Sequence, residues 1–218
     1  MKKRFVTALC ATVLTLLASA AHATTLTYDV VINTTSLVGS SLAPFALDFQ
    51  LTGGTPSPSS ASIYNVTFGV PQAAPSDPPA TAVGLASGTL ASGVTLDVNS
   101  ANFFSEFFEG FVPGGLLGFT LDVTLNGNAP SPDALAVKLL YDDGTGAFPE
   151  ITTNGFANTL LLFNLDSANP TFQVFSGVDD FAGVSASAAP VPEPATLVLF
   201  GTGLLGMSAR RWRTRRAS

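Results

Sequence analysis

Residues 24–190, which we call the body, contain no cysteine, histidine, tryptophan, methionine or arginine. Without histidine or cysteine, the body cannot build a Ser-His-Asp or Cys-His catalytic group or the usual kind of zinc site. It also cannot form a disulfide, so its stability must come from burying apolar side chains, among them 15 phenylalanines and three tyrosines. The sequence has no phosphate-binding loop and no dinucleotide fingerprint. These absences exclude most familiar classes of enzyme.

Positive charge is nearly absent from the body. Lys138 is its only basic residue against 14 acidic ones, which gives the body a net charge of −13, whereas the whole chain carries −6. The other eight basic residues lie in the two ends of the chain. A body of this charge repels polyanions, so nucleic acid is excluded as its partner.

Helical periodicity is also scarce, and 17 glycines and 13 prolines in the body mark frequent turns. Residues 45–52 alternate strictly between apolar and polar, which predicts a strand with one wet face. Further strands are expected at residues 24–35, 63–70, 82–90, 94–98, 116–126, 134–141, 159–165 and 171–175, with an edge strand at 184–187. This pattern indicates one mainly β domain over residues 24–184, an antiparallel β-sandwich. A jelly-roll-like topology is preferred, and an immunoglobulin-like Greek key stays open.

Three segments between these strands need separate interpretation. Residues 102–111 (NFFSEFFEGF) fit either a short helix, with phenylalanines at i, i+4 and i+8, or an extended segment that buries paired phenylalanines. The proline-rich residues 71–79 are predicted to form a loop that cannot join a central strand. Residues 185–190 are small and are predicted to be a linker.

Carboxylates are the only abundant chemistry of the body. Glu106 and Glu109 would share one face of a helix, but nothing marks them as an acid–base pair, so we expect no enzyme and no catalytic residue. Calcium is the one cofactor hypothesis, because hard cations prefer oxygen ligands. The alternative is that the acidic residues cap turns, and the spacing of an EF-hand loop is absent. The calcium candidates are Asp142, Asp143, Asp179 and Asp180.

The first 23 residues are typical of a signal peptide. Three basic residues precede an apolar run, and Ala21 and Ala23 supply the small residues of a signal-peptidase site. We expect cleavage before Thr24 and export through the inner membrane.

The last 28 residues, 191–218, combine three features without a spacer. The first is an extended motif of Val191, Pro192, Glu193 and Pro194, in which the prolines prevent helix or sheet pairing. The second is an uncharged run, 195–209, which predicts a transmembrane helix of about 22 Å, short of the ~30 Å hydrocarbon core. The third is a basic tail that would stay cytoplasmic. Its arginines are Arg210, Arg211, Arg213, Arg215 and Arg216.

This arrangement resembles the PEP-CTERM sorting signal of bacterial surface proteins, also catalogued as an ice-binding protein C-terminal domain. The resemblance implies that an exosortase, a membrane-embedded protease, recognises the motif and removes the tail. The chain would be anchored transiently in the inner membrane and then reach the cell surface or extracellular matrix. A plain single-pass anchor is the alternative.

Two functions stay open for the body. One is a non-catalytic surface or matrix protein associated with exopolysaccharide or biofilm. The other is a lectin-like, carbohydrate-binding module on the same scaffold, with or without calcium. The expected partners are signal peptidase, the exosortase, the inner membrane and a polysaccharide.

Overall fold

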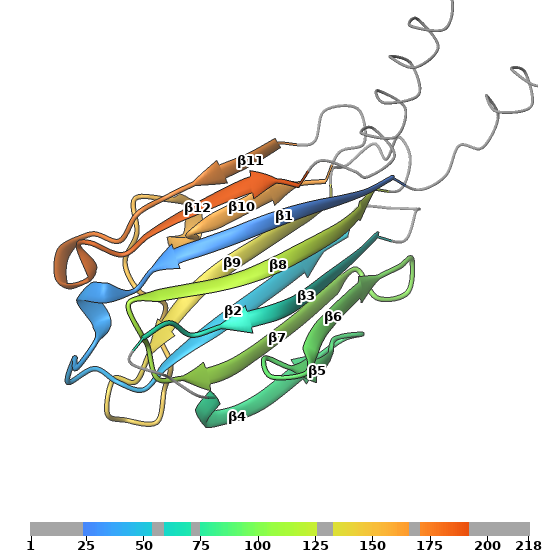
Figure 1. The fold of residues 1–218 in the computed structure, drawn as a ribbon. Coiled ribbons are helices and arrows are strands. Elements are labelled where there is room, and N and C mark those ends of the chain that lie inside the picture. Colours follow the sequence, from blue (N-terminus) through green and yellow to red (C-terminus); the bar gives the residue numbers. More distant parts are fainter. Residues whose placement is uncertain (1–23, 54–58, 71–74, 126–132, 166–170, 192–218) are drawn as a thin grey trace, which may run out of the picture.

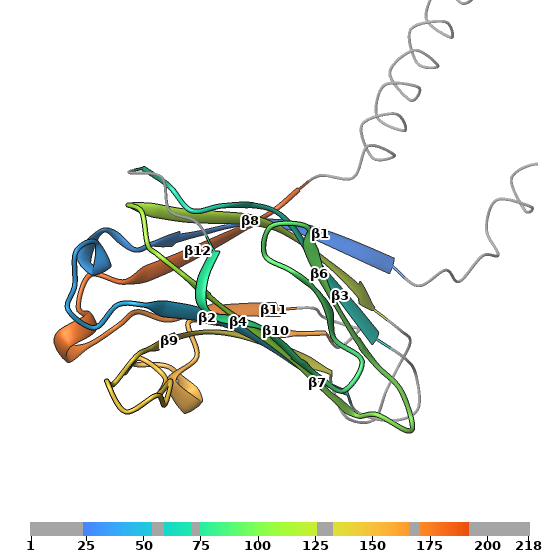
Figure 2. The ribbon, with the colours of Figure 1, turned by 90° about the horizontal axis from the view of Figure 1, so that it is seen from below.

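Two six-stranded antiparallel sheets pack face to face in the computed structural model, which describes residues 24–53, 59–70, 75–125, 133–165 and 171–191 (Figures 1 and 2). The predicted mainly β fold and its β-sandwich architecture are therefore confirmed. The helices of the described residues are single 3₁₀ turns, and none of them is long and apolar enough to cross a membrane. The segment 195–209 lies outside the described residues.

The strands of each sheet follow a spatial order that differs from their order in the chain. Sheet A consists of β12 (Ser185–Pro190), β1 (Thr24–Asn33), β8 (Leu116–Leu125), β3 (Ser59–Thr67), β6 (Gly93–Val98) and β5 (Ser87–Thr89). Sheet B consists of β11 (Thr171–Val174), β10 (Leu161–Asn164), β9 (Ala134–Tyr141), β2 (Phe45–Thr52), β7 (Phe104–Phe111) and β4 (Pro75–Val83). The 3₁₀ turns are η1 (Thr35–Leu37), η2 (Phe156–Asn158) and η3 (Asp179–Phe181).

Strand pairing follows a nested order. Strand β1 pairs with β8, β2 with β7 and β3 with β6, all antiparallel. Strands β1 to β4 alternate between the two sheets, so each connection crosses the sandwich at one of its ends. Every strand from the first part of the chain therefore depends on a later strand for its hydrogen bonds.

The core lies between the sheets, where period-2 alternation directs the apolar residues. In β2 the side chains of Phe45, Leu47, Phe49 and Leu51 are fully buried, as the sequence predicts. The ring of Phe49 meets that of Phe119 in β8 edge to face, with centroids 5.5 Å apart, and so joins sheet B to sheet A. Each such side chain contributes about 1.5–3 kcal/mol of stability relative to leaving it exposed.

Residues 102–111 form no helix. Strand β7 runs through them and pairs with β2 over eight residues, so the helical interpretation is wrong and the extended one is confirmed. Phe107 and Phe111 point into the core and are buried, whereas Phe103, ahead of the strand, is 65% exposed. The strand is more stable than a helix here because a helical segment would leave this edge of β2 without its backbone hydrogen bonds.

The proline-rich segment 71–79 is not a loop throughout. Strand β4 begins at Pro75, and it tolerates its prolines because it is the edge strand of sheet B. Its register with β7 shifts between Ser76 and Thr81, which leaves Pro78 and Pro79 outside the ladder. The strand predicted over 82–90 is divided, because β5 pairs with β6 in the other sheet.

The linker predicted at residues 185–190 is wrong, whereas the edge strand predicted at 184–187 is confirmed in part. Residues 185–190 form β12, which pairs with β1 over six residues at the edge of sheet A. Ala186 and Ala188 are partly buried and pack against the core beside the buried Val30 and Ile32. The small residues of β12 show no alternation of large apolar and polar side chains. The strand forms because β1 has an unpaired edge whose backbone groups it can hydrogen-bond.

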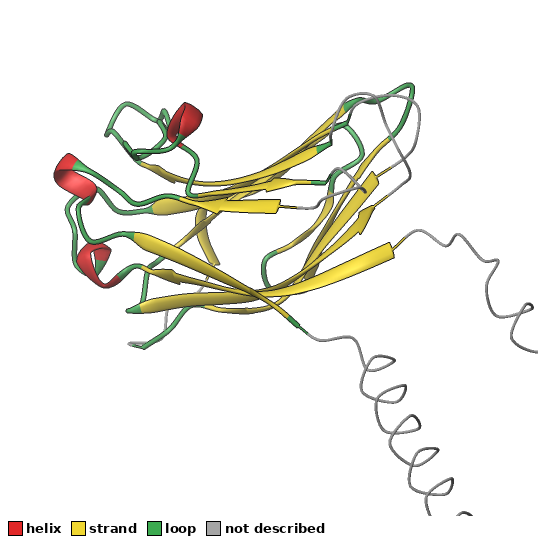
Figure 3. Ribbon diagram, turned by 90° about the horizontal axis from the view of Figure 1, so that it is seen from above, coloured by secondary structure: helices red, strands yellow, loops and turns green. Residues whose placement is uncertain are grey.

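The strand directions give the sandwich two different ends. Thr24 lies opposite Leu125, and the backbone N–H of Val191 donates to the carbonyl of Thr27 at 2.8 Å, so the chain enters and leaves the described fold at the same end. We call this the signal end. The 3₁₀ turns lie at the other, distal end (Figure 3).

Candidate functional site

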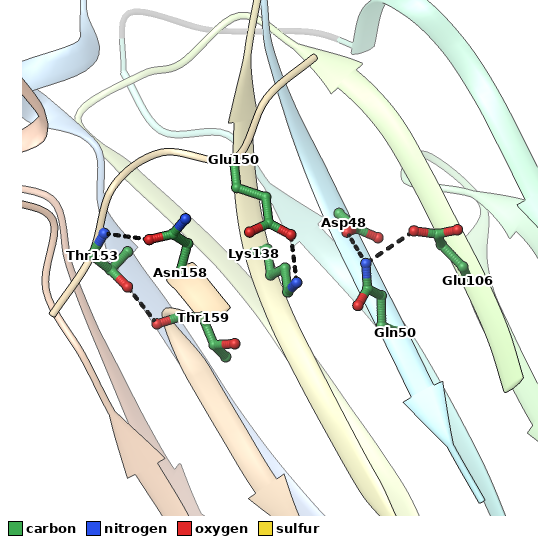
Figure 4. Close-up of polar contacts among 8 residues, drawn as sticks. All are labelled: Asp48, Gln50, Glu106, Lys138, Glu150, Thr153, Asn158 and Thr159. Atoms are coloured by element: carbon green, nitrogen blue, oxygen red, sulfur yellow. Dashed lines mark hydrogen bonds and ion pairs between the residues drawn. The ribbon is translucent and has the colours of Figure 1, made fainter. Parts of the chain in front are cut away.

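A line of five polar side chains crosses the outer face of sheet B, the face turned away from the core (Figure 4). Strand β7 supplies Glu106, β2 supplies Asp48 and Gln50, and β9 supplies Lys138. Glu150 comes from the β9–β10 connection, where a backbone bridge holds it against β9. These five residues are called the polar row.

Cross-strand register assembles the row from residues far apart in the chain. Gln50 lies directly opposite Glu106, and Asp48 lies directly opposite Lys138. The Gln50 side-chain amide donates to Asp48 Oδ2 at 2.7 Å and to Glu106 Oε1 at 3.0 Å. Lys138 Nζ forms an ion pair with Glu150 Oε1. The row thus places three carboxylates beside one ammonium group.

Asp48 is the unusual member of the row. It is 2% exposed, and its Oδ1 is buried without a hydrogen-bond partner among the described residues. Burial above all, together with the charges of Glu106 and Glu150, raises the pKa of Asp48 to about 7, against the lowering effects of Lys138 and the Gln50 hydrogen bond. A carboxyl group on this strand is therefore half protonated near neutral pH.

Glu106 and Glu109, which would share a face if residues 102–111 were helical, lie on opposite faces of β7. Because β7 is a strand, Glu106 lies on the outer face and Glu109 lies on the inner one. Glu109 is buried, and its Oε2 accepts the backbone N–H of Leu90 at 2.6 Å. The sequence does not single out Asp48, Gln50 and Glu150, because only the register of β7, β2 and β9 makes them neighbours.

The calcium candidates lie in two separate turns near the distal end. Asp142 Oδ1 accepts the N–H of Gly144, and Asp143 Oδ1 accepts both the N–H and the hydroxyl of Thr145. These hydrogen bonds from Thr145 lower the pKa of Asp143. The Asp179–Asp180 pair opens η3. Within the part of the chain that the structure describes, no three His, Cys, Asp or Glu residues are grouped so that they would hold a metal ion.

The predicted signal peptide ends where β1 begins, and the sorting motif follows β12, both at the signal end of the sandwich. Thr24, predicted to follow the signal-peptidase cut, is the first residue of β1. Among the described residues, Val191 makes the last backbone hydrogen bond after β12. Ala21, Ala23, Pro192, Glu193, Pro194 and the five arginines of the tail lie outside the described residues.

Residues 190–216 match the family model of the PEP-CTERM protein-sorting motif. This chain carries a PEP-CTERM sorting motif. The resemblance drawn from the sequence is therefore confirmed, and the match begins at Pro190, the last residue of β12. A PEP-CTERM motif implies export, anchoring in the membrane and processing by an exosortase, which leads to the cell surface. No curated protein and no solved structure matches the chain.

Proposed function

We propose that this is a non-catalytic surface or extracellular-matrix protein, exported by the signal peptide 1–23 and processed by an exosortase at its PEP-CTERM motif. The uncharged run 195–209 crosses the inner membrane, and the arginine-rich tail stays in the cytoplasm until processing. The processed body then joins the exopolysaccharide or biofilm layer around the cell. Signal peptidase, the exosortase and the polysaccharide are its partners.

The observation that carries this proposal is the position of the motif relative to the fold. The match begins at Pro190, where β12 ends, and the last described backbone hydrogen bond belongs to Val191. A cut at or after the Pro-Glu-Pro segment would remove none of the described strands. An extended segment next to a finished fold is the form in which a protease binds its substrate.

The absence of a catalytic role is supported by the residues that the body has. It contains no histidine or cysteine, and its one lysine is paired with Glu150. Asp48 has a raised pKa and is 2% exposed, and its side-chain hydrogen-bond donor among the described residues is the amide of Gln50, which is not a nucleophile. The chemistry of sorting belongs to the exosortase, and this chain is the substrate.

A triple substitution of Pro192, Glu193 and Pro194 by alanine in the native host tests the sorting proposal. We expect the altered protein to stay in the inner-membrane fraction with its tail intact, while the surface fraction loses it. Pro79→Ala, at an exposed proline in the edge strand β4, is the matched control and should be sorted normally. Normal surface delivery of the triple variant would contradict the proposal.

A lectin-like role is the second candidate. The nested pairing of β1 with β8, β2 with β7 and β3 with β6 supports a jelly-roll topology, a scaffold that lectin domains use. A glycan array probed with the purified protein, with and without calcium, tests this role. Reproducible binding to a sugar would support it, and binding lost on chelation would add calcium as a cofactor.

A further inference from the structure

We propose that the polar row on the outer face of sheet B binds the ammonium groups of a cationic glycan, one that contains free amino sugars. This inference rests on the lectin-like role and names its site and ligand class. It is independent of sorting, since the row lies on the described sandwich and the motif begins at Pro190, where that sandwich ends.

The negative charge of the row and of the body favours a cationic ligand. Three of the five residues in the row are carboxylates, and the only base of the body is already in it. The surrounding body carries −13, so it attracts cationic polymers and repels uronic-acid or sulfated ones. The pairing of Lys138 Nζ with Glu150 Oε1 shows that the row already holds an alkylammonium group.

The oxygen Oδ1 of Asp48, which has no hydrogen-bond donor among the described residues, favours a ligand rich in donors. Both hydrogens available from the Gln50 amide go to Asp48 Oδ2 and Glu106 Oε1. Oδ1 of Asp48 remains buried without a donor among the described residues. An unpaired buried acceptor costs stability, and a charged donor relieves it more effectively than a neutral one. An ammonium group has three donors and no acceptor, which suits a site that already contains too many acceptors.

The shape of the row favours an oligosaccharide over a single sugar. It crosses four neighbouring segments, which is about 14 Å at the usual strand spacing. Glu106, Gln50 and Glu150 are partly exposed and form the accessible rim above Asp48. Phe104 and Phe108 share the outer face of β7 with Glu106 and are partly exposed, so they offer apolar surface to sugar rings.

Calorimetric titration of the full-length protein in detergent tests the proposal, with partially deacetylated chitin oligosaccharides as the probe. We expect binding that weakens as salt rises, because it depends on charge. Fully N-acetylated oligosaccharides of the same length should bind at least about tenfold more weakly. Equal affinity for the acetylated and deacetylated forms, or no heat with either, would overturn the proposal.

Two variants with the same change in charge separate the row from general attraction. Glu106→Gln keeps an acceptor for Gln50 but removes one negative charge, and it should weaken binding about tenfold. Asp97→Asn removes an exposed carboxylate from the outer face of sheet A and should change the affinity less than about twofold. Equal losses in both variants would show non-specific attraction and overturn the assignment to the row.

The pH dependence gives a readout that a merely structural role would not produce. Binding an ammonium group to Asp48 requires the carboxylate form, so the affinity should rise with pH up to the pKa of about 7 and fall at higher pH, where the amino sugar loses its own proton. Asp48→Asn, which keeps the shape and the acceptor for Gln50, should remove this rise. A rise that persists unchanged in the variant would contradict the role of Asp48. Such a failure would leave exosortase processing intact, because processing is read from the mass of the C-terminus.

Discussion

At the scale of single residues, Asp48 concentrates the unusual chemistry of the body. Alternation in residues 45–52 predicts a strand with a wet face, yet Asp48 on that face is buried by its neighbours on β7 and β9. Desolvation is the largest cause of its raised pKa, and Glu106 and Glu150 add to it. The protein retains a proton there that an exposed aspartate would lose.

Asp48 should make folding stability depend on pH. Since its folded pKa is about 7 and the unfolded value is 3.8, the folded state holds more protons between these values. The free energy of unfolding should then fall as the pH rises from about 4 to about 7, by up to about 4 kcal/mol, and stay level above that range. Denaturant titrations of the wild type and of Asp48→Asn would measure this, and identical slopes in the two proteins would contradict it. The charged groups that face Asp48 are Glu106, Lys138 and Glu150.

Lys138 should be needed mainly where Asp48 is ionised. Lys138→Met removes the one cation among three carboxylates, so it should destabilise the fold by about 3 kcal/mol above the pKa of Asp48. The loss should be smaller well below that pKa, where Asp48 is protonated. Lys138→Arg keeps the charge and is the matched control. An equal loss for the methionine variant on both sides of the pKa would show that packing, and not charge, is responsible.

At the scale of strands, some elements can be predicted from their own residues and others form only because a partner strand is present. The predicted bounds of β2 and β9 agree with the structure: β2 alternates between apolar and polar residues, and β9 places Leu135, Val137 and Leu139 in the buried core. Strands β4, β7 and β12 depend on partners: β7 on the ladder of β2, β4 on the edge of β7, and β12 on β1. The pattern of β4 predicts a proline-rich loop, that of β7 fits either a helix or an extended segment, and that of β12 predicts a linker that overlaps a short edge strand.

The same limit explains the candidate sites. The sorting motif is a continuous stretch, so the sequence alone is enough to recognise it. The polar row is assembled by the register of β2 with β7 and β9. This register pairs residues that are far apart in the chain, so no continuous stretch of sequence shows it. A helix over residues 102–111 would place Glu106 and Glu109 on one face, whereas the strand places them on opposite faces.

Gly110 should be indispensable for the approach of β4 to β7. A Cβ at this position would lie 2.1 Å from the carbonyl oxygen of Asp77, which is too close for any side chain. Gly110→Ala should therefore push β4 away and lower the free energy of unfolding by about 1–3 kcal/mol. Gly115→Ala, whose nearest neighbour would be Thr35 Oγ1 at 3.5 Å, is the control and should be nearly neutral. Equal stability of both variants would contradict this explanation of how β4 packs.

Strand β12 should be part of the fold and not a tether. A chain that ends at Val184 loses one of the two partners of β1 and exposes Val30 and Ile32 at the sheet edge. It should be destabilised by about 3 kcal/mol or more relative to a chain that ends at Val191. Thermal unfolding of the two chains would decide the matter, since equal midpoints would mean that residues 185–190 contribute nothing to stability.

At the scale of the whole molecule, charge and topology separate the body from its two ends. The body carries −13, and eight of the nine basic residues lie outside it. Both ends leave the sandwich at the signal end, so a membrane that holds either end faces this side. The 3₁₀ turns and the acidic turns Asp142–Asp143 and Asp179–Asp180 lie at or near the distal end, facing outward (Figure 3).

Mass spectrometry of the protein isolated from the cell surface of its native host tests the central claim most directly. Processing by an exosortase predicts a C-terminus at or shortly after the Pro-Glu-Pro segment, with β12 retained and residues 195–218 gone. A surface protein whose mass includes the intact arginine-rich tail would contradict this claim, because the chain would then be a plain membrane-anchored protein.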